Sequence, residues 1–167
     1  MIYYTSFKSK SFGDIFLAKS EKGICAVSIA EIPENFIRYL QQHFDEGINR
    51  NDQQLAGIVQ QLVEYFEGKR QKFQITIDWS CIPSSFDRKV LQELFYIPFG
   101  QLVSYQELAR LAGKAKAARA VGNALGRNPM SIIIPCHRVI RKDGSLGGYT
   151  GGLEIKRRLL ELEGLHF

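Results

Sequence analysis

Apolar and polar residues alternate with a period of two near the start of the chain. Residues 14–20 and 24–29 both follow this pattern, and Glu21-Lys22-Gly23 separates them. Alternation of this kind is typical of strands with one buried face, and a short polar segment with glycine is typical of the turn between them. The pattern therefore predicts a β-hairpin. A second alternating run at 72–77 is expected to return to the same sheet.

The apolar spacing then changes to three and four residues, which indicates helices. Pro33 stands where a first helical residue is preferred, and the pattern predicts a helix over 33–43. A longer helix is expected over Asp52–Phe66, capped by its first residue, with Gly68 as its stop. Together with the strands, these helices predict a small N-terminal α/β domain over residues 1–80. Its polar residues form no cluster that suggests a site.

A segment with Pro and Ser at 80–84 interrupts the periodicity and marks the expected domain boundary. Beyond it, the apolar spacing predicts a helix over 86–96, with Ser84 or Ser85 as its cap. Ser104-Tyr105-Gln106-Glu107 has the S-x-x-E sequence of a capping box, in which Ser and Glu side chains accept from each other's backbone N–H groups. A short helix is therefore expected to begin there.

A second short helix is expected over 115–125, after a turn that contains glycine. Two short helices joined in this way form the helix-turn-helix pattern. Ala and Gly dominate the second helix, and Arg119 projects from its middle. Small residues let a helix approach closely whatever it faces, and few side chains here could read base edges. This favours a DNA binder that is indifferent to sequence, with simple helix packing as the alternative.

The chain ends in a glycine-rich loop at 147–152 and a predicted helix over 153–163. Its Ile and Leu residues are expected to be buried, and the three basic residues at 156–158 to point outward. With the preceding helices, this helix completes a mainly helical C-terminal domain over 84–167. The predicted fold class is therefore α+β.

Cys136, His137 and Arg138 stand in a row inside a run of Ile and Val that the pattern predicts to be a strand. Burying such groups costs free energy unless pairing or chemistry compensates for it. A cysteine becomes a strong nucleophile when neighbours stabilise its thiolate. Since adjacent residues in an extended chain point to opposite faces, His137 would reach the thiol through a water, and Glu163 or Glu161 would orient the imidazole. A structural cysteine with satisfied polar neighbours is the alternative.

The charge of the chain is unevenly distributed. Residues 1–83 hold 9 basic and 10 acidic residues, whereas residues 84–167 hold 13 basic and 7 acidic ones. All of the net charge of +5 therefore comes from the half that contains Cys136. This asymmetry indicates an anionic partner, with nucleic acid as the first candidate and a solubilising surface as the alternative.

The three cysteines, Cys25, Cys81 and Cys136, include no C-x-x-C pair. They predict neither a disulfide framework nor a zinc site, and Cys25 and Cys81 are expected to be buried small hydrophobes. No apolar run approaches the roughly 20 residues of a membrane helix, and the first residues lack the layout of a signal peptide. A cytoplasmic location, without membrane contact, is expected.

Several motifs together resemble those of one family. Pro135–Val139, with Gly126–Pro129 before it and Gly148–Leu153 after it, is similar to the signature of the O6-alkylguanine-DNA alkyltransferases. Residues 103–109 and 117–122 resemble the helix-turn-helix of that family. The match is densest over the C-terminal domain and continues more weakly through the N-terminal domain. The resemblance implies a ribonuclease H-like fold for the latter.

The resemblance also implies the chemistry of the site. Cys136 would accept the alkyl group from guanine, and His137 and Glu163 would form with a water the relay that deprotonates it. Tyr105 would hydrogen-bond the flipped base and give it a proton. The backbone carbonyls of Cys136 and Val139 would accept from the guanine amino group.

Further residues would bind the DNA or the base. Arg119 would enter the duplex in place of the flipped nucleotide, and Asn128 would hold the helix-turn-helix against the active-site loop. The backbone N–H of Thr150 would donate to the guanine oxygen, with Tyr149 beside it in the same loop. The remaining DNA-binding candidates, on the small-residue helix, are Ala118 and Gly122.

The implied reaction consumes the protein, because a thioether at Cys136 has no easy leaving group. The implied partner is double-stranded DNA carrying O6-alkylguanine, bound by a monomer in solution or by several copies along the DNA. No cofactor and no metal are expected, since the N-terminal domain lacks the Cys and His set of the zinc-containing members. Ser131 and Thr150 depart from the residues common in the family, and both are expected to line the pocket. The location would be nuclear in a eukaryote.

Three other functions were compared with alkyl transfer. A non-transferring sensor of alkyl damage is the main alternative, although such relatives carry Trp in place of the acceptor cysteine. A cysteine hydrolase would leave the helix-turn-helix and Arg119 unexplained. A transcription factor would need a regulatory domain for which this length has no room.

Overall fold

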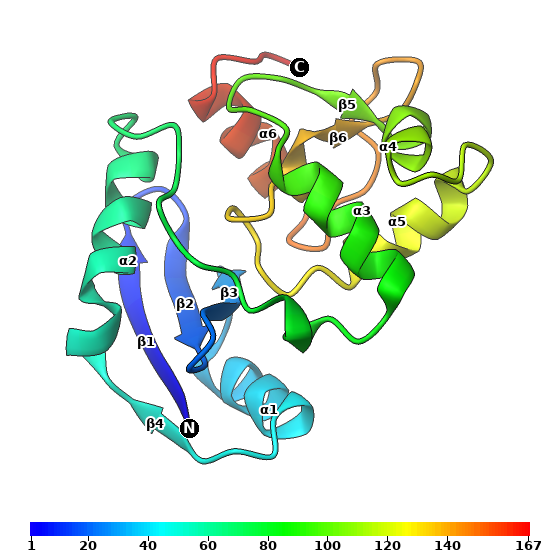
Figure 1. Cartoon of the computed structure of the whole chain (residues 1–167). Coiled ribbons are helices and arrows are strands. Elements are labelled where there is room, and N and C mark those ends of the chain that lie inside the picture. The colour runs from blue at the N-terminus through cyan, green and yellow to red at the C-terminus, as the bar shows by residue number, and fades with distance from the viewer. The chain divides into compact units, whose positions relative to one another are not determined.

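The computed structural model describes all residues from 1 to 167, and the chain divides into two compact units (Figure 1). The first comprises Met1–Cys81 and Pro129–Ser131, and the second comprises Ile82–Asn128 and Ile132–Phe167. The first unit contains a four-stranded sheet, whereas the second is mainly helical. The predicted α+β fold class is therefore confirmed.

The sheet of the first unit has the strand order β3-β2-β1-β4. Its strands are β1 (Ile2–Ser9), β2 (Gly13–Lys19), β3 (Ile24–Ile29) and β4 (Ile48–Arg50). The antiparallel pair β2-β3 is the predicted hairpin, and β1 adds to it antiparallel while β4 runs parallel to β1. The sequence did not predict β1, because only Ile2 and Thr5 of this strand are buried and its Tyr and Ser residues blur the alternation.

Two helices cover the sheet, and both match the predicted segments. In α1 (Pro33–His43), Phe36 and Leu40 join the core around Phe16. In α2 (Asp52–Phe66), Asp52 accepts from the buried Thr5 hydroxyl at 2.6 Å. Because Thr5 lies one position away from the residues that face α1, the two helices pack on opposite faces.

The predicted cap of α2 was one residue too late. Asn51 is the N-cap, and its side chain accepts from the backbone N–H of Gln54 at 3.1 Å. Asp52 is instead the first helical residue, and Arg50 donates to its carboxylate at 2.9 Å. Asn is as good a cap as Asp, so the two neighbouring residues were equivalent signals.

The strand predicted at 72–77 was wrong. This segment makes only an isolated bridge between Ile77 and Ile24, before the short helix η1 (Trp79–Cys81). A second segment, Pro129–Ser131, pairs with the same edge of β3. Val27 donates to the Pro129 carbonyl at 2.9 Å and accepts from Ser131 N–H at 3.1 Å. Two short segments therefore occupy the edge that one strand was expected to fill.

The second unit contains four helices and a two-stranded parallel sheet. The helices are α3 (Ser85–Phe95), α4 (Tyr105–Leu111), α5 (Ala118–Gly126) and α6 (Leu153–Leu162), and the strands are β5 (Val103–Ser104) and β6 (Val139–Ile140). Ser84 caps α3 by accepting from Asp87 N–H at 3.1 Å, as one of the two predicted caps. No helix of the chain combines the length and apolar character that crossing a bilayer requires.

Helices α4 and α5 form the expected helix-turn-helix. Ser104 caps α4 by accepting from Glu107 N–H at 3.0 Å, but the Glu107 carboxylate pairs with Arg110 instead of completing the capping box. Gly113, with φ +84°, and Lys114 close the end of α4 in a Schellman motif. The turn continues to Ala117, so α5 begins three residues later than predicted.

The stretch around Cys136 is not the predicted strand. Ile132 has φ +72°, and Pro135 has no N–H with which to pair in a sheet. The chain instead turns through the 3-10 helix η2 (Cys136–Arg138), and only Val139–Ile140 forms a strand. Successive side chains in such a helix diverge by about 120°, so Cys136 and His137 do not point to opposite faces.

Candidate active site

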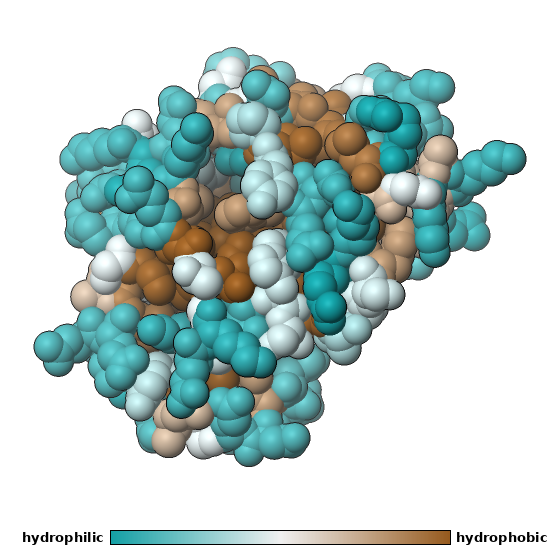
Figure 2. Space-filling model, viewed as in Figure 1, coloured by the Kyte–Doolittle hydropathy of each residue, from teal (hydrophilic) through white to brown (hydrophobic).

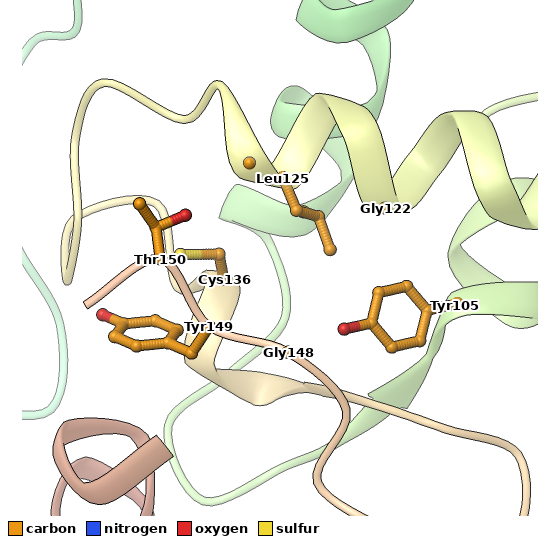
Figure 3. Close-up of a pocket in the computed structure, with 8 residues that line it drawn as sticks. Tyr105, Gly122, Leu125, Cys136, Gly148, Tyr149 and Thr150 are labelled. Atoms are coloured by element: carbon orange, nitrogen blue, oxygen red, sulfur yellow. The ribbon is translucent and has the colours of Figure 1, made fainter. Parts of the chain in front are cut away.

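Residues from α4, α5, η2 and the 148–150 loop line one pocket of the second unit (Figure 3). The lining consists of Tyr105, Gly122, Leu125, Gly126, Cys136, Gly148, Tyr149 and Thr150. Its cavity volume is about 220 Å³. This is below the roughly 300–1,000 Å³ of sites for drug-sized ligands, so the pocket suits one small group.

Cys136 supplies the thiol of this pocket, with 8% of its surface exposed. Burial raises the pKa of the thiol, whereas hydrogen bonds from Asn128 and Tyr149 and the positive charge of Lys156 act to lower it. The resting group is therefore a neutral thiol whose thiolate has stabilising neighbours. Figure 3 shows Cys136 close to Tyr149 and Thr150 at one end of the pocket.

His137, the residue after Cys136, forms a buried pair with Glu163. Nε2 of His137 lies 2.5 Å from Oε2 of Glu163, and neither side chain is exposed. Burial acts to raise the pKa of Glu163, but His137 and Arg138 outweigh it and lower that pKa, while burial lowers the pKa of His137. An ionised carboxylate only accepts hydrogen bonds, so Nε2 carries the proton and Nδ1 the basic lone pair. The structure brings Glu163 to His137 and leaves Glu161 exposed.

Arg138 holds Glu163 in place from a second side. Its Nε donates to the Glu163 carboxylate at 2.7 Å and its Nη1 to the Ile97 carbonyl at 2.6 Å. The backbone N–H of Gly100 donates to the same carboxylate at 3.2 Å. Glu163 is thus an ionised acceptor fixed by several donors, which sets the orientation of the His137 ring.

Asn128 connects the end of α5 with the turn before Cys136. Its Nδ2 donates to the Ile134 carbonyl at 2.9 Å. The preceding residue, Arg127, pairs through two nitrogens with the buried Asp87 of α3, at 2.7 and 2.9 Å. The hinge predicted at Asn128 therefore lies between this ion pair and the turn that precedes Cys136.

Tyr105 enters the pocket from α4, opposite Cys136, and its hydroxyl points inward (Figure 3). Gly147, with φ +72°, lies under its ring, and a Cβ added there would come within 2.8 Å of the hydroxyl oxygen. Gly122 of α5 lies on another side of the same ring, where a Cβ would be 3.9 Å away. Two glycines therefore leave room for the ring.

The predicted DNA-binding residues differ in their places. Arg119 is exposed on α5 and does not line the pocket, whereas Ala118 is half-buried on the same helix. Figure 2 shows hydrophilic side chains at the right of the view, on the side where Figure 1 places the turn before α5. In this turn Lys114 and Lys116 are exposed. Val139 lies outside the lining, and its carbonyl accepts from Lys156.

Lys156 was predicted to point outward, and this was wrong. Its side chain is fully buried, and its Nζ donates to the carbonyls of Val139, Leu146 and Gly148. Lys156 and Glu163 are spaced with Leu159 and Leu160 as i, i+3, i+4 and i+7, which is one helical face. This spacing could have predicted that Lys156 lies on the buried face of the helix, but a lysine is normally expected on the exposed face. Leu125, Gly126 and Gly148 also line the pocket, although they were not among the predicted site residues.

Two family models match almost the whole chain. The model described as 6-O-methylguanine DNA methyltransferase, ribonuclease-like domain, matches residues 2–79, and the DNA binding domain of the same family matches residues 85–165. A methylated-DNA–protein-cysteine methyltransferase of Mycolicibacterium paratuberculosis is 47% identical over 120 residues, or 72% of each chain. The enzyme of that name from Methanosarcina barkeri is 39% identical and covers 97% of both chains.

Solved structures agree with these matches. Mycobacterium tuberculosis OGT in complex with DNA is 35% identical, with a TM-score of 0.83, covering 96% of this chain and 92% of that one. The O6-methylguanine methyltransferase of the same organism has a TM-score of 0.82 at 34% identity, covering 98% of this chain and 93% of that one. The likeness therefore extends over both units.

Proposed function

Because the chain belongs to the 6-O-methylguanine DNA methyltransferase family, we propose that it repairs duplex DNA by transferring the alkyl group of O6-alkylguanine to Cys136. One observation carries this proposal. Cys136 lines a pocket of about 220 Å³, and the next residue, His137, is held by the buried Glu163. A thiol, a base and its orienting carboxylate are the parts that an activated cysteine needs.

Activation is proposed to begin with proton transfer from Cys136 to His137. The neutral imidazole would take the thiol proton through a water at Nδ1, while Nε2 stays with Glu163. Ionised Glu163 stabilises the resulting imidazolium in the buried site. Neighbouring Asn128 and Tyr149 favour the thiolate, as their effect on the pKa of Cys136 indicates.

The transfer itself would be a displacement at the alkyl carbon. The Cys136 sulfur forms the new S–C bond, and the C–O bond to guanine breaks with its electron pair moving onto the base. Tyr105, whose hydroxyl points into the pocket, would give the leaving guanine a proton and regain one from His137. The balance is one thiol and one alkylguanine converted to one thioether and one guanine.

The alkylated base must leave the duplex before a thiol can reach it. Arg119, exposed on α5, is proposed to fill the space that the base leaves. Ala118 and Gly122 would let this helix approach the minor groove, with Asn128 as the link from the helix to the acceptor turn. In the pocket, the carbonyls of Cys136 and Val139 would accept from the base, and the Thr150 N–H would donate to its oxygen.

We further propose that the protein acts as a monomer, alone or in several copies along DNA, and is consumed after one transfer. A thioether at Cys136 offers no easy route back to the thiol. Because the substrate is genomic DNA, the protein is proposed to work in the cytoplasm of a cell without a nucleus, or in the nucleus of a eukaryote.

The test is to incubate the protein with a duplex that carries one O6-methylguanine and to measure the intact mass and the peptide masses. The expected result is the mass of one methyl group on the peptide of Cys136 and none on those of Cys25 and Cys81. A methyl group on another residue, or several repairs by one molecule, would contradict the proposal. Tight binding without an adduct would instead identify a damage sensor.

A further inference from the structure

Lys156 is the fourth residue of α6, and none of its surface is exposed. A buried ammonium group is costly unless its donors are satisfied. Here all three have acceptors: the carbonyls of Val139 at 2.6 Å, Leu146 at 2.5 Å and Gly148 at 3.1 Å. The side chain thus fastens β6 to two points of the loop that follows it.

This loop forms one wall of the pocket. Gly148, whose carbonyl Lys156 holds, lines the pocket itself and is followed directly by the lining residues Tyr149 and Thr150. Val139, the other end of the link, follows η2 and hence Cys136. One ammonium group therefore links the strand that follows Cys136 to the loop that forms this wall of the pocket.

Carbonyl oxygens satisfy the donors of Lys156 but do not neutralise its charge. The charged and titratable groups around this region are Cys136 and His137 of η2, Arg138 beside them, Arg141 of the following turn, Tyr149 of the loop and Glu163 at the end of α6. Glu163 is already engaged by His137 and Arg138. The charge of Lys156 therefore has no committed counter-ion until Cys136 ionises.

Lys156 and Cys136 each affect the pKa of the other. Burial lowers the pKa of Lys156 to about 8, and the Cys136 charge acts to raise it. The Lys156 charge in turn acts to lower the pKa of Cys136 against the effect of burial. Below its own pKa, Lys156 supplies a buried cation that is compensated only in the thiolate state, and this cation stabilises that state relative to the thiol.

We propose that Lys156 is a positioning residue for alkyl acceptance: it holds the 146–148 loop on β6 and supplies the buried positive charge that favours the Cys136 thiolate. This inference rests on the proposed function, since it concerns the acceptor of the proposed transfer. It adds a residue that acts through Cys136 and the pocket wall, without touching the alkyl group.

The test measures thiolate formation directly, without DNA. Cys136 is alkylated by iodoacetamide at a series of pH values, and the rate is followed on its peptide by mass spectrometry. In Lys156→Met the midpoint of the pH profile is expected to rise by at least one pH unit, with about a tenfold slower reaction at pH 7. Lys156→Arg keeps the charge, so its rate of alkylation at pH 7 is expected to remain within about threefold of that of the original protein.

Two further variants make the result specific. Arg157→Met removes a neighbouring charge of α6 that is 42% exposed, and it is expected to leave the profile unchanged. Lys156→Gln keeps hydrogen-bond donors for the carbonyls without the charge, so it serves where Lys156→Met does not fold. A folded Lys156→Gln or Lys156→Met with the original midpoint overturns the electrostatic role.

A second readout separates this inference from the function. The same variants are compared for single-turnover transfer from duplex DNA with O6-methylguanine, where Lys156→Met is expected to be at least tenfold slower. If the original protein shows no transfer, the proposed function fails while the iodoacetamide profile still decides the effect of Lys156 on Cys136. If transfer occurs and the midpoint does not move, only the inference fails.

Discussion

Cys25 and Cys136 are both buried thiols, and burial raises the pKa of each, yet their surroundings differ. Cys25 lies on β3 and belongs to the same core cluster as Phe16, Phe36 and Leu40. Burial raises its pKa to about 12. The nearby Cys81 and Asp78 act in the same direction. At Cys136, by contrast, the neighbouring groups oppose burial. Burial alone therefore does not distinguish the proposed acceptor, Cys136, from Cys25.

The neighbours of a thiol, rather than its exposure, separate the two regions. Around Cys136 the chain places two hydrogen-bonding side chains and a lysine. Around Cys25 it places aromatic and aliphatic packing. If this difference decides reactivity, substitutions in the second unit will change transfer, and matched substitutions in the first unit will change only stability.

The largest expected effect comes from the two cysteines themselves. Cys136→Ala should abolish transfer while duplex binding persists, because the alkyl group loses its acceptor. Cys25→Ala should lower the free energy of unfolding by about 1 kcal/mol through lost packing and leave transfer unchanged. Adduct formation is measured by mass and unfolding by urea titration. Residual alkyl uptake in Cys136→Ala would show that the reactive thiol lies elsewhere.

The buried carboxylates offer the next comparison. Glu163→Gln should slow transfer at least about 100-fold, because the imidazole loses the group that stabilises its protonated form. It should also lower the free energy of unfolding by about 3–5 kcal/mol, since Arg138 is left as an unpaired buried charge. Single-turnover kinetics and urea titration provide the two readouts.

The matched control in the first unit is Asp78→Asn. Asp78 is also buried, and it accepts from the hydroxyls of Ser20 at 2.6 Å and Ser80 at 2.5 Å. Its replacement should lower the free energy of unfolding by about 1–3 kcal/mol without a change in transfer. Equal transfer rates in both variants would remove Glu163 from the proposed relay.

Elements with a local signal in the sequence were predictable, and elements without one were not. The helix starts at Pro33, Ser84 and Ser104 were predictable because each carries its own capping or conformational signal. The turn before Cys136 was not predictable. It depends on a positive φ at Ile132, which is unusual for a β-branched residue, and no glycine or asparagine there indicates such a conformation.

The candidate site was predictable to a similar degree. The resemblance supplied Cys136, His137 and Glu163, and the structure brings the last two into contact. It did not supply Lys156, since a lysine is seldom buried and its three acceptors are backbone carbonyls of the strand and loop before the helix. Backbone acceptors leave no trace in side-chain patterns.

A smaller effect is expected from two glycines that share a positive φ. Gly147 and Gly68 have φ values of +72° and +73°, so replacement by Ala should cost each about 1 kcal/mol of stability. Only at Gly147 would the new methyl group meet Tyr105, whereas nothing lies within 4 Å of it at Gly68. Gly147→Ala should therefore slow transfer about tenfold, and Gly68→Ala should not. Identical kinetics would show that the position of the Tyr105 ring does not limit the reaction.

The smallest expected effect compares two helix caps. Ser104 caps α4 and Asn51 caps α2, each through one hydrogen bond, so Ser104→Ala and Asn51→Ala should each lower the free energy of unfolding by about 1 kcal/mol. Because Tyr105 is the first residue of α4, fraying there also displaces the pocket hydroxyl, and transfer should slow about twofold to threefold in Ser104→Ala alone. Ser104→Asp, which restores a good cap, should recover the rate. A rate that follows stability equally in both alanine variants would mean that transfer depends on folding in general, and that the difference between the two regions does not extend to their helix ends.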